Sequence, residues 1–206
     1  MFPARIHLAS VLSLMLLSAT TFAGDSPEDI KQRIGTGDPI AGKEKSALCQ
    51  GCHGEDGNSP APDFPKLAGL YAVYIQKQIN DFKSGLRKDP VMTDMAATIT
   101  DPKDLLDIAA YFASQPVMKG ASAVVNNSGM ARFNDSNGCG ACHGANGKGN
   151  ASAPAIGGQH KEYIVKQLKD FKTGARRNEA SGIMAMYSGM LSDAAMDEVA
   201  SYAAGL

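Results

Sequence analysis

The chain has 206 residues, and its 20 Lys and Arg nearly balance its 21 Asp and Glu, for a formal net charge of −1. No basic stripe is present to neutralise phosphates, so we do not expect nucleic acid as a partner. Four cysteines are too few for the disulfide framework of a small secreted domain.

The first 23 residues have the features of a secretory signal peptide. Arg5 gives a positive start, an apolar run of about ten residues follows at 8–17, and Ala23 supplies the small residue before cleavage. The run is too short to span a bilayer, so a retained anchor is the weaker alternative. No later stretch has the length and apolarity of a transmembrane segment. We expect a periplasmic protein, and loose association with the membrane stays open.

All four cysteines fall in two Cys-x-x-Cys-His motifs, at 49–53 and 139–143. This motif is the signature of covalent c-type haem attachment, in which the two thiols bind the vinyl groups and the histidine binds the iron. The sequence therefore predicts two covalently bound haem c groups. The residues assigned to them are Cys49, Cys52, His53, Cys139, Cys142 and His143.

Other uses of a Cys-x-x-Cys pair fit less well. A thioredoxin-like redox motif belongs in a βαβ setting, whereas the flanking patterns here are helical. A zinc ribbon needs its cysteine pairs within about 15–20 residues of each other. The two motifs here lie 90 residues apart.

The rest of the chain is an internal repeat. The segment 74–87 matches 163–176 at an offset of 89, and the haem motifs match at 90. A period this long indicates two tandem domains, because solenoid repeats are shorter. We predict an N-terminal domain at 24–117 and a C-terminal domain at 118–206. A linker is expected at about 115–127, which contains proline, glycine and small or polar residues.

Both domains are predicted to be all-α, with a cytochrome c-like fold wrapped around the haem. In the first, we expect helices from the N-cap Asp38 to Cys49, over 69–84, and from 101 to about 114. The second repeats them near 128–142, 158–173 and 192–204. Units of about 80–95 residues have thin cores, so each haem would also serve as core. Predicted core positions are Leu70, Tyr74, Ile75, Ile79, Phe82, Leu105, Ile108 and Phe112.

The sixth iron ligand decides what such a haem does, because an open position lets small molecules bind and a second strong ligand favours electron transfer. Removing the signal leaves three histidines, of which His160 is expected to be a loop or surface residue and not a ligand. At most one haem could therefore have two histidine ligands, so methionine is the expected ligand of at least one. Met92 and Met184 each lie nine residues before the aspartate that opens the final helix, and we favour them. A register anchored on the final-helix tyrosines selects Met95 and Met186 instead.

Two more pairs of residues stand out in the repeat. Pro65 and Pro154 follow the haem histidines by 12 and 11 residues, and either accept from the imidazole N–H or simply turn the chain. Arg87 and Arg176 end the repeated helix, and either pair with haem propionates or are solvated.

The chain resembles the dihaem cytochrome c4 family over nearly all of its length after the signal. The resemblance rests on Asn-Ser-Pro-Ala-Pro-Asp-Phe-Pro-Lys-Leu-Ala-Gly at 58–69, on two Lys-Gln-(Ile/Leu)-x-Asp-Phe-Lys-x-Gly segments, and on Asp-Ile-Ala-Ala-Tyr at 107–111. It implies two class I cytochrome c domains related by a pseudo-twofold axis, with His/Met ligation that uses Met92 and Met184. The second domain departs from the pattern at 153–156, where Ala-Pro-Ala-Ile replaces the Asp-Phe-Pro-Lys-Leu of the first.

The resemblance implies a monomeric periplasmic electron carrier, not an enzyme, that takes electrons from a quinol-oxidising cytochrome bc complex to a terminal oxidase. One rival is the dihaem subunit of a periplasmic dehydrogenase such as flavocytochrome c sulfide dehydrogenase, which requires a permanent flavoprotein interface. A second is a dihaem peroxidase-like enzyme, which needs an open iron and an acid–base group beside it. No distal histidine lies near either methionine segment.

Overall fold

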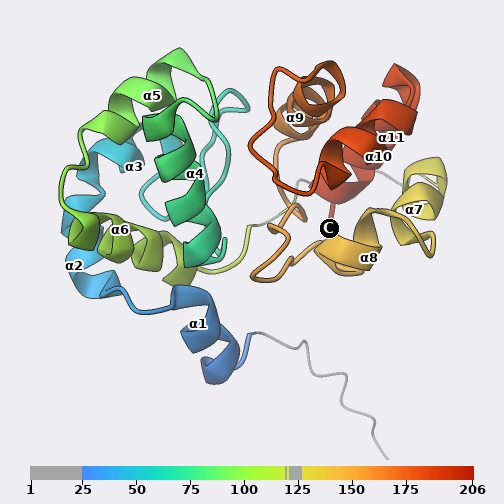
Figure 1. The fold of residues 1–206 in the computed structure, drawn as a ribbon. Coiled ribbons are helices and arrows are strands. Elements are labelled where there is room, and N and C mark those ends of the chain that lie inside the picture. Colours follow the sequence, from blue (N-terminus) through green and yellow to red (C-terminus); the bar gives the residue numbers. More distant parts are fainter. Residues whose placement is uncertain (1–24, 119, 121–126) are drawn as a thin grey trace, which may run out of the picture.

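The computed structural model describes residues 25–118, 120 and 127–206 (Figure 1). The predicted signal peptide at 1–23 lies outside these residues. Throughout the described ranges the regular structure is α-helical, which confirms the predicted all-α class. Within the same ranges, no helix is long and apolar enough to cross a membrane.

The first six helices form one of two units that lie side by side (Figure 1). Three of these helices begin alike: an aspartate side chain accepts backbone N–H bonds and a proline occupies the first turn, at Asp38, Asp89 and Asp101. The helices are α1 (Pro27–Ile34), α2 (Pro39–Lys45), α3 (Ala47–His53), α4 (Ala72–Ser84), α5 (Pro90–Ala97) and α6 (Pro102–Ser114).

The other unit repeats this arrangement with five helices. The contact of α2 with α6 is repeated by α7 with α11, and α4 packs on α5 and α6 as α9 packs on α10 and α11. The elements are α7 (Asn127–Asn134), α8 (Cys139–His143), α9 (Lys161–Thr173), α10 (Ile183–Met190) and α11 (Asp193–Ala204).

The predicted core positions of the first unit lie where the helical stripes placed them. Six are buried: Leu70, Ile75, Phe82, Leu105, Ile108 and Phe112. Tyr74 and Ile79 are partly buried against the same cluster. Met118 also belongs to this cluster, although the sequence assigned it to the second domain; the 117/118 boundary stays a prediction.

Two predicted helices are each divided in the structure. α2 ends at its C-cap, Ser46, whose Oγ donates to the carbonyl of Lys43 at 2.9 Å, and α3 begins at the next residue. In the second unit, Asp135 accepts from the N–H of Asn137 and turns the chain between α7 and α8. Side chains that bond to nearby backbone compete with the helix in this way.

Three helices were not predicted, α1, α5 and α10, each of eight residues. α1 carries a readable signal, a capping box in which Ser26 and Asp29 exchange hydrogen bonds. Its Arg33 is buried and donates through Nε to the carbonyl of Ala113 at 2.7 Å. α1 is thereby fixed to the end of α6.

The crossing of α2 over α6 depends on a glycine. A Cβ added at Gly42 would lie 1.9 Å from the carbonyl oxygen of Asp107, and one at Gly129 would lie 2.2 Å from that of Glu198.

We expect Gly42→Ala to push α2 off α6 and to lower the free energy of unfolding of the N-terminal unit by about 3 kcal/mol, the upper part of the range for overpacking. Thermal unfolding of the haem-loaded protein measures this.

A matched control is Gly51→Ala in α3. A Cβ there has no atom within 4 Å, and the repeat already has alanine at the corresponding position, 141. The control should be neutral or stabilising by about 0.5–1 kcal/mol. Equal stability of the two variants would contradict the close crossing.

Candidate haem sites

The first motif lies along α3, and its side chains meet on one turn of helix. Cys49 and Cys52 are three residues apart, and both thiols are free. Burial raises the pKa of the Cys49 thiol, so it stays protonated at neutral pH. His53 closes the helix and is 5% exposed.

The His53 ring is held by a backbone carbonyl. Its Nδ1 lies 2.7 Å from the carbonyl oxygen of Pro65. A carbonyl only accepts, so Nδ1 carries the proton and the lone pair is on Nε2, which bonds to no described residue. Burial lowers the pKa of His53, against the opposing effect of the Pro65 hydrogen bond. The ring is thus a neutral imidazole with its metal-binding nitrogen free.

The second site repeats this geometry at α8. Cys139 and Cys142 are free thiols, and Nδ1 of His143 lies 2.7 Å from the carbonyl oxygen of Pro154. Burial lowers the pKa of His143 as well. Both prolines therefore supply the acceptor that the sequence left undecided, and the altered loop at 153–156 keeps it.

Met92 and Met184 occupy corresponding places on α5 and α10. Each is half-buried, and an acidic side chain fixes its backbone: Asp89 Oδ1 accepts from the Met92 N–H at 3.0 Å, and Glu179 Oε2 accepts from the Met184 N–H at 3.2 Å. Met184 also packs against the core cluster of its own unit.

Burial follows the same pattern along the two helices, and Met95 of the alternative register is half-buried, as Met92 is. The only buried described residue of α5 is Ala96, and that of α10 is Ser188. They follow Met92 and Met184 by four residues, one helical turn. Met186, favoured by the alternative register, is 55% exposed.

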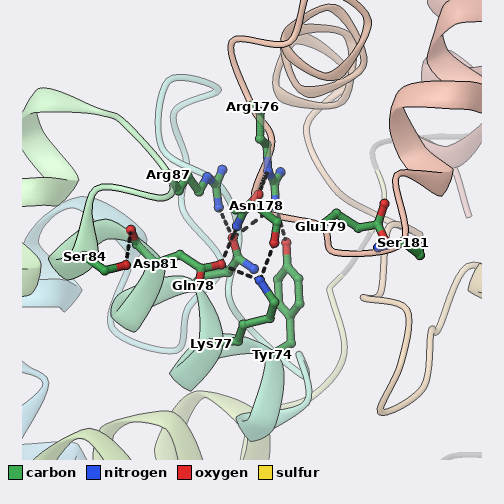
Figure 2. Close-up of polar contacts among 10 residues, drawn as sticks. All are labelled: Tyr74, Lys77, Gln78, Asp81, Ser84, Arg87, Arg176, Asn178, Glu179 and Ser181. Atoms are coloured by element: carbon green, nitrogen blue, oxygen red, sulfur yellow. Dashed lines mark hydrogen bonds and ion pairs between the residues drawn. The ribbon is translucent and has the colours of Figure 1, made fainter.

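Arg87 links the two units, and Figure 2 shows its contact with Gln78 in its own unit. Its guanidinium donates to Gln78 Oε1 in its own unit at 2.8 Å. It also donates to Tyr163 OH and to Gln167 Oε1 in the other unit, each at 2.9 Å. Arg87 is therefore a cross-unit donor.

Arg176 makes the equivalent set of contacts from the second unit (Figure 2). It donates to Gln167 Oε1 of its own unit at 2.7 Å, and to Gln78 Oε1 and Tyr74 OH of the first unit at 3.0 and 3.2 Å. Arg176 is buried, so the solvated interpretation is wrong for it. Burial alone would raise the pKa of Tyr74, but the charges of Arg176 and Arg87 lower it overall.

One corner of this network breaks the symmetry. Asn178 Nδ2 donates to Asp81 Oδ2 at 2.6 Å and to Gln78 Oε1 at 2.9 Å, and Lys77 Nζ donates to the Asn178 carbonyl (Figure 2). The residue equivalent to Asn178 in the first unit is Asp89, which caps α5 instead. Gln78 and Gln167 of this network were not among the predicted site residues, although both copies of the repeat have glutamine at that position.

His160 lies just before α9, as its loop assignment predicted, and is half-buried. Its Nε2 is 3.0 Å from the carbonyl oxygen of Ser59 in the first unit. The ring therefore belongs to the contact between the units.

The residues of both sites fit a covalent haem: two free thiols one turn apart and a buried imidazole whose Nε2 is free. The cytochrome c family model matches the chain twice, at residues 40–116 and 128–206. Cytochrome c4 from Pseudomonas aeruginosa is 43% identical over 180 residues, which cover 82% of this chain and 89% of that protein. The chain belongs to the cytochrome c4 family.

Two further relatives resemble the chain over most of its length. The crystal structure of reduced cytochrome c4 from Pseudomonas stutzeri superposes with a TM-score of 0.77 at 42% identity, over 82% of this chain and 99% of that one. A thiosulfate dehydrogenase electron acceptor from Stutzerimonas stutzeri is 33% identical over 97% of this chain and 94% of its own. The predicted fold of two tandem cytochrome c domains is confirmed, and the protein is a dihaem electron-transfer protein with covalently bound haem c.

Proposed function

We propose that this cytochrome c4 is a monomeric periplasmic electron carrier in which His53 and Met92 bind one iron and His143 and Met184 bind the other. Cys49 and Cys52 hold the first haem through thioethers, and Cys139 and Cys142 hold the second. The haem supplies reversible one-electron chemistry when bound. The observation that carries the proposal is that each unit has a neutral buried imidazole and a methionine whose backbone N–H donates to an acidic side chain.

The protein residues keep the iron closed to other chemistry. The Pro65 and Pro154 carbonyls fix the imidazole rings, and the carboxylates of Asp89 and Glu179 hold the methionine backbones in place. Peroxide chemistry would need an acid–base group beside an open iron, whereas His160 is engaged with Ser59. Two strong ligands favour electron transfer, and methionine favours the reduced iron.

We propose a quinol-oxidising cytochrome bc complex as the donor and a terminal oxidase as the acceptor. A second candidate role, acceptor for a periplasmic dehydrogenase, is supported by the 33% identity with the thiosulfate dehydrogenase electron acceptor. Both roles use the same two sites and differ only in the protein that delivers the electrons.

Mixing experiments with the native protein test this proposal. We expect rapid reoxidation of the reduced protein by membranes that contain terminal oxidase, and slow turnover of peroxide by the fully oxidised and half-reduced forms. Efficient peroxide turnover in the half-reduced form would show that one iron opens, and would refute the carrier role. Reduction rates with quinol and the bc complex, compared with thiosulfate and its dehydrogenase, separate the two donors.

A further inference from the structure

Gln159, the residue before the N-cap of α9, makes a two-point contact with the backbone of Lys66 in the other unit. Its Oε1 accepts from the Lys66 N–H at 2.9 Å, and its Nε2 donates to the Lys66 carbonyl at 2.9 Å. Gln159 is 5% exposed, so both hydrogen bonds are shielded from water. Shielded hydrogen bonds are electrostatically stronger than solvated ones.

The Lys66 N–H belongs to the same peptide group as the Pro65 carbonyl, which accepts from His53 Nδ1 at 2.7 Å. That group is planar and rigid, so fixing its N–H also fixes the direction of its carbonyl. A hydrogen bond at one end of a peptide group also polarises the other end. His53, the Pro65–Lys66 peptide and Gln159 thus form one continuous chain of hydrogen bonds across the units.

Neighbouring contacts hold the rest of the same loop against the second unit. Lys66 Nζ donates to the carbonyl of Gly158 at 2.8 Å. At the start of the loop, Nε2 of His160 lies 3.0 Å from the carbonyl oxygen of Ser59. Residues 158–160 therefore bind the loop at 59–66, the first haem loop, at both of its ends.

The repeat does not supply this contact in the opposite direction. The residue equivalent to Gln159 is Leu70, which is buried in the first unit's core and has no side-chain amide. The residue equivalent to Lys66 is Ala155, which packs with the first unit's core cluster. The two haem loops are thus supported by different chemistry.

We propose that Gln159 is a positioning residue for His53, through which the C-terminal unit lowers the reduction potential of the first haem. The inference rests on the proposed ligation of iron by His53. A stronger hydrogen bond at Nδ1 makes the imidazole a more basic ligand, which favours oxidised iron. Loss of Gln159 loosens the Pro65 carbonyl and raises the potential of that haem alone.

The test uses Gln159→Met in the full haem-loaded chain, since methionine matches glutamine in length but cannot pair with Lys66. A redox titration followed by NMR reads each haem separately. We expect the equilibrium constant for reduction of the first haem to rise at least threefold, about 28 mV at 59 mV per tenfold change, with the second haem unchanged. In the reduced protein, the His53 ring N–H should exchange with solvent faster than in the wild type.

Gln167→Met is the matched control, because Gln167 also bridges the units but accepts its hydrogen bonds there from Arg87 and Arg176. It should leave exchange at the His53 N–H unchanged. Equal acceleration by both variants would mean that the interface merely loosens, and would overturn the proposal. No shift of the first haem, or equal shifts of both, would also overturn it.

Gln159→Asn keeps the amide but shortens its reach, and should shift the first haem in the same direction if the methionine variant does not fold. The wild-type spectrum separates this inference from the proposed ligation. If the His53 ring protons are not shifted by the haem, the ligand assignment fails. If they are shifted and the potentials of both variants stay at the wild-type values, only the inference fails.

Discussion

Replacing Cys49 and Cys52 together with alanine should halve the covalent haem content of the chain and unfold much of the N-terminal unit. Phe112 is one of the few large side chains of the first unit that are completely buried. A unit of this size needs an additional core element for stability. Acid–acetone extraction followed by a pyridine haemochrome spectrum gives the haem-to-chain ratio. Circular dichroism follows the loss of helix.

The matched variant replaces Cys139 and Cys142, and should instead remove the second haem and unfold the C-terminal unit. Each variant should retain the haem of the other unit. The assignment of two covalent haems to these four cysteines would be refuted by a haem-to-chain ratio near one in the wild-type protein. It would also be refuted if the haem colour left that protein with the extracting solvent.

Replacing Met92 or Met184 with alanine should each remove about half of the weak red-edge absorption band that marks methionine bound to oxidised iron. Each change should also open one iron to added ligands such as cyanide or imidazole, because it removes the sulfur that we propose as the sixth ligand. Optical titration of the oxidised protein measures both effects. The prediction rests on the corresponding places of the two methionines, whose backbone N–H groups donate to Asp89 and Glu179.

Met95→Ala and Met186→Ala are the controls, since they belong to the alternative register. Both should leave the band nearly intact. Met186 is 55% exposed, so its removal should also cost little stability. Loss of the band in these variants, with retention in Met92→Ala and Met184→Ala, would show that the register anchored on the tyrosines is the correct one.

Local patterns were enough to predict the haem motifs and most of the helices that carry them. The Cys-x-x-Cys-His spacing needs only one turn of helix, and the core stripe of α4 follows from its apolar period. The short helices α5 and α10 were missed, because eight residues around a ligand have little amphipathic period. The sequence also left open whether Pro65 and Pro154 accept from the histidine rings or only turn the chain, because this depends on where each loop folds back.

The contact between the units could not be predicted from either copy of the repeat. Gln78 and Arg176 are far apart in the chain, and they meet only because α4 and α9 face each other. Gln159 and His160 carried a weaker signal, because they stand where the first copy has Leu70 and Tyr71. A polar pair in the place of an apolar one marks a position whose surroundings differ between the copies.

The paired arginines give the contact between the units the self-complementary form of a homodimer interface, since each repeats what its counterpart does. Two free chains would have to offset the lost freedom of association before such a polar contact could form. The covalent connection between α6 and α7 removes most of that cost, with an effective concentration on the order of millimolar. The covalent connection thus keeps the two units together, and the hydrogen bonds between them set the angle at which the units lie. Natural variation can therefore retune that angle one polar residue at a time without letting the halves separate.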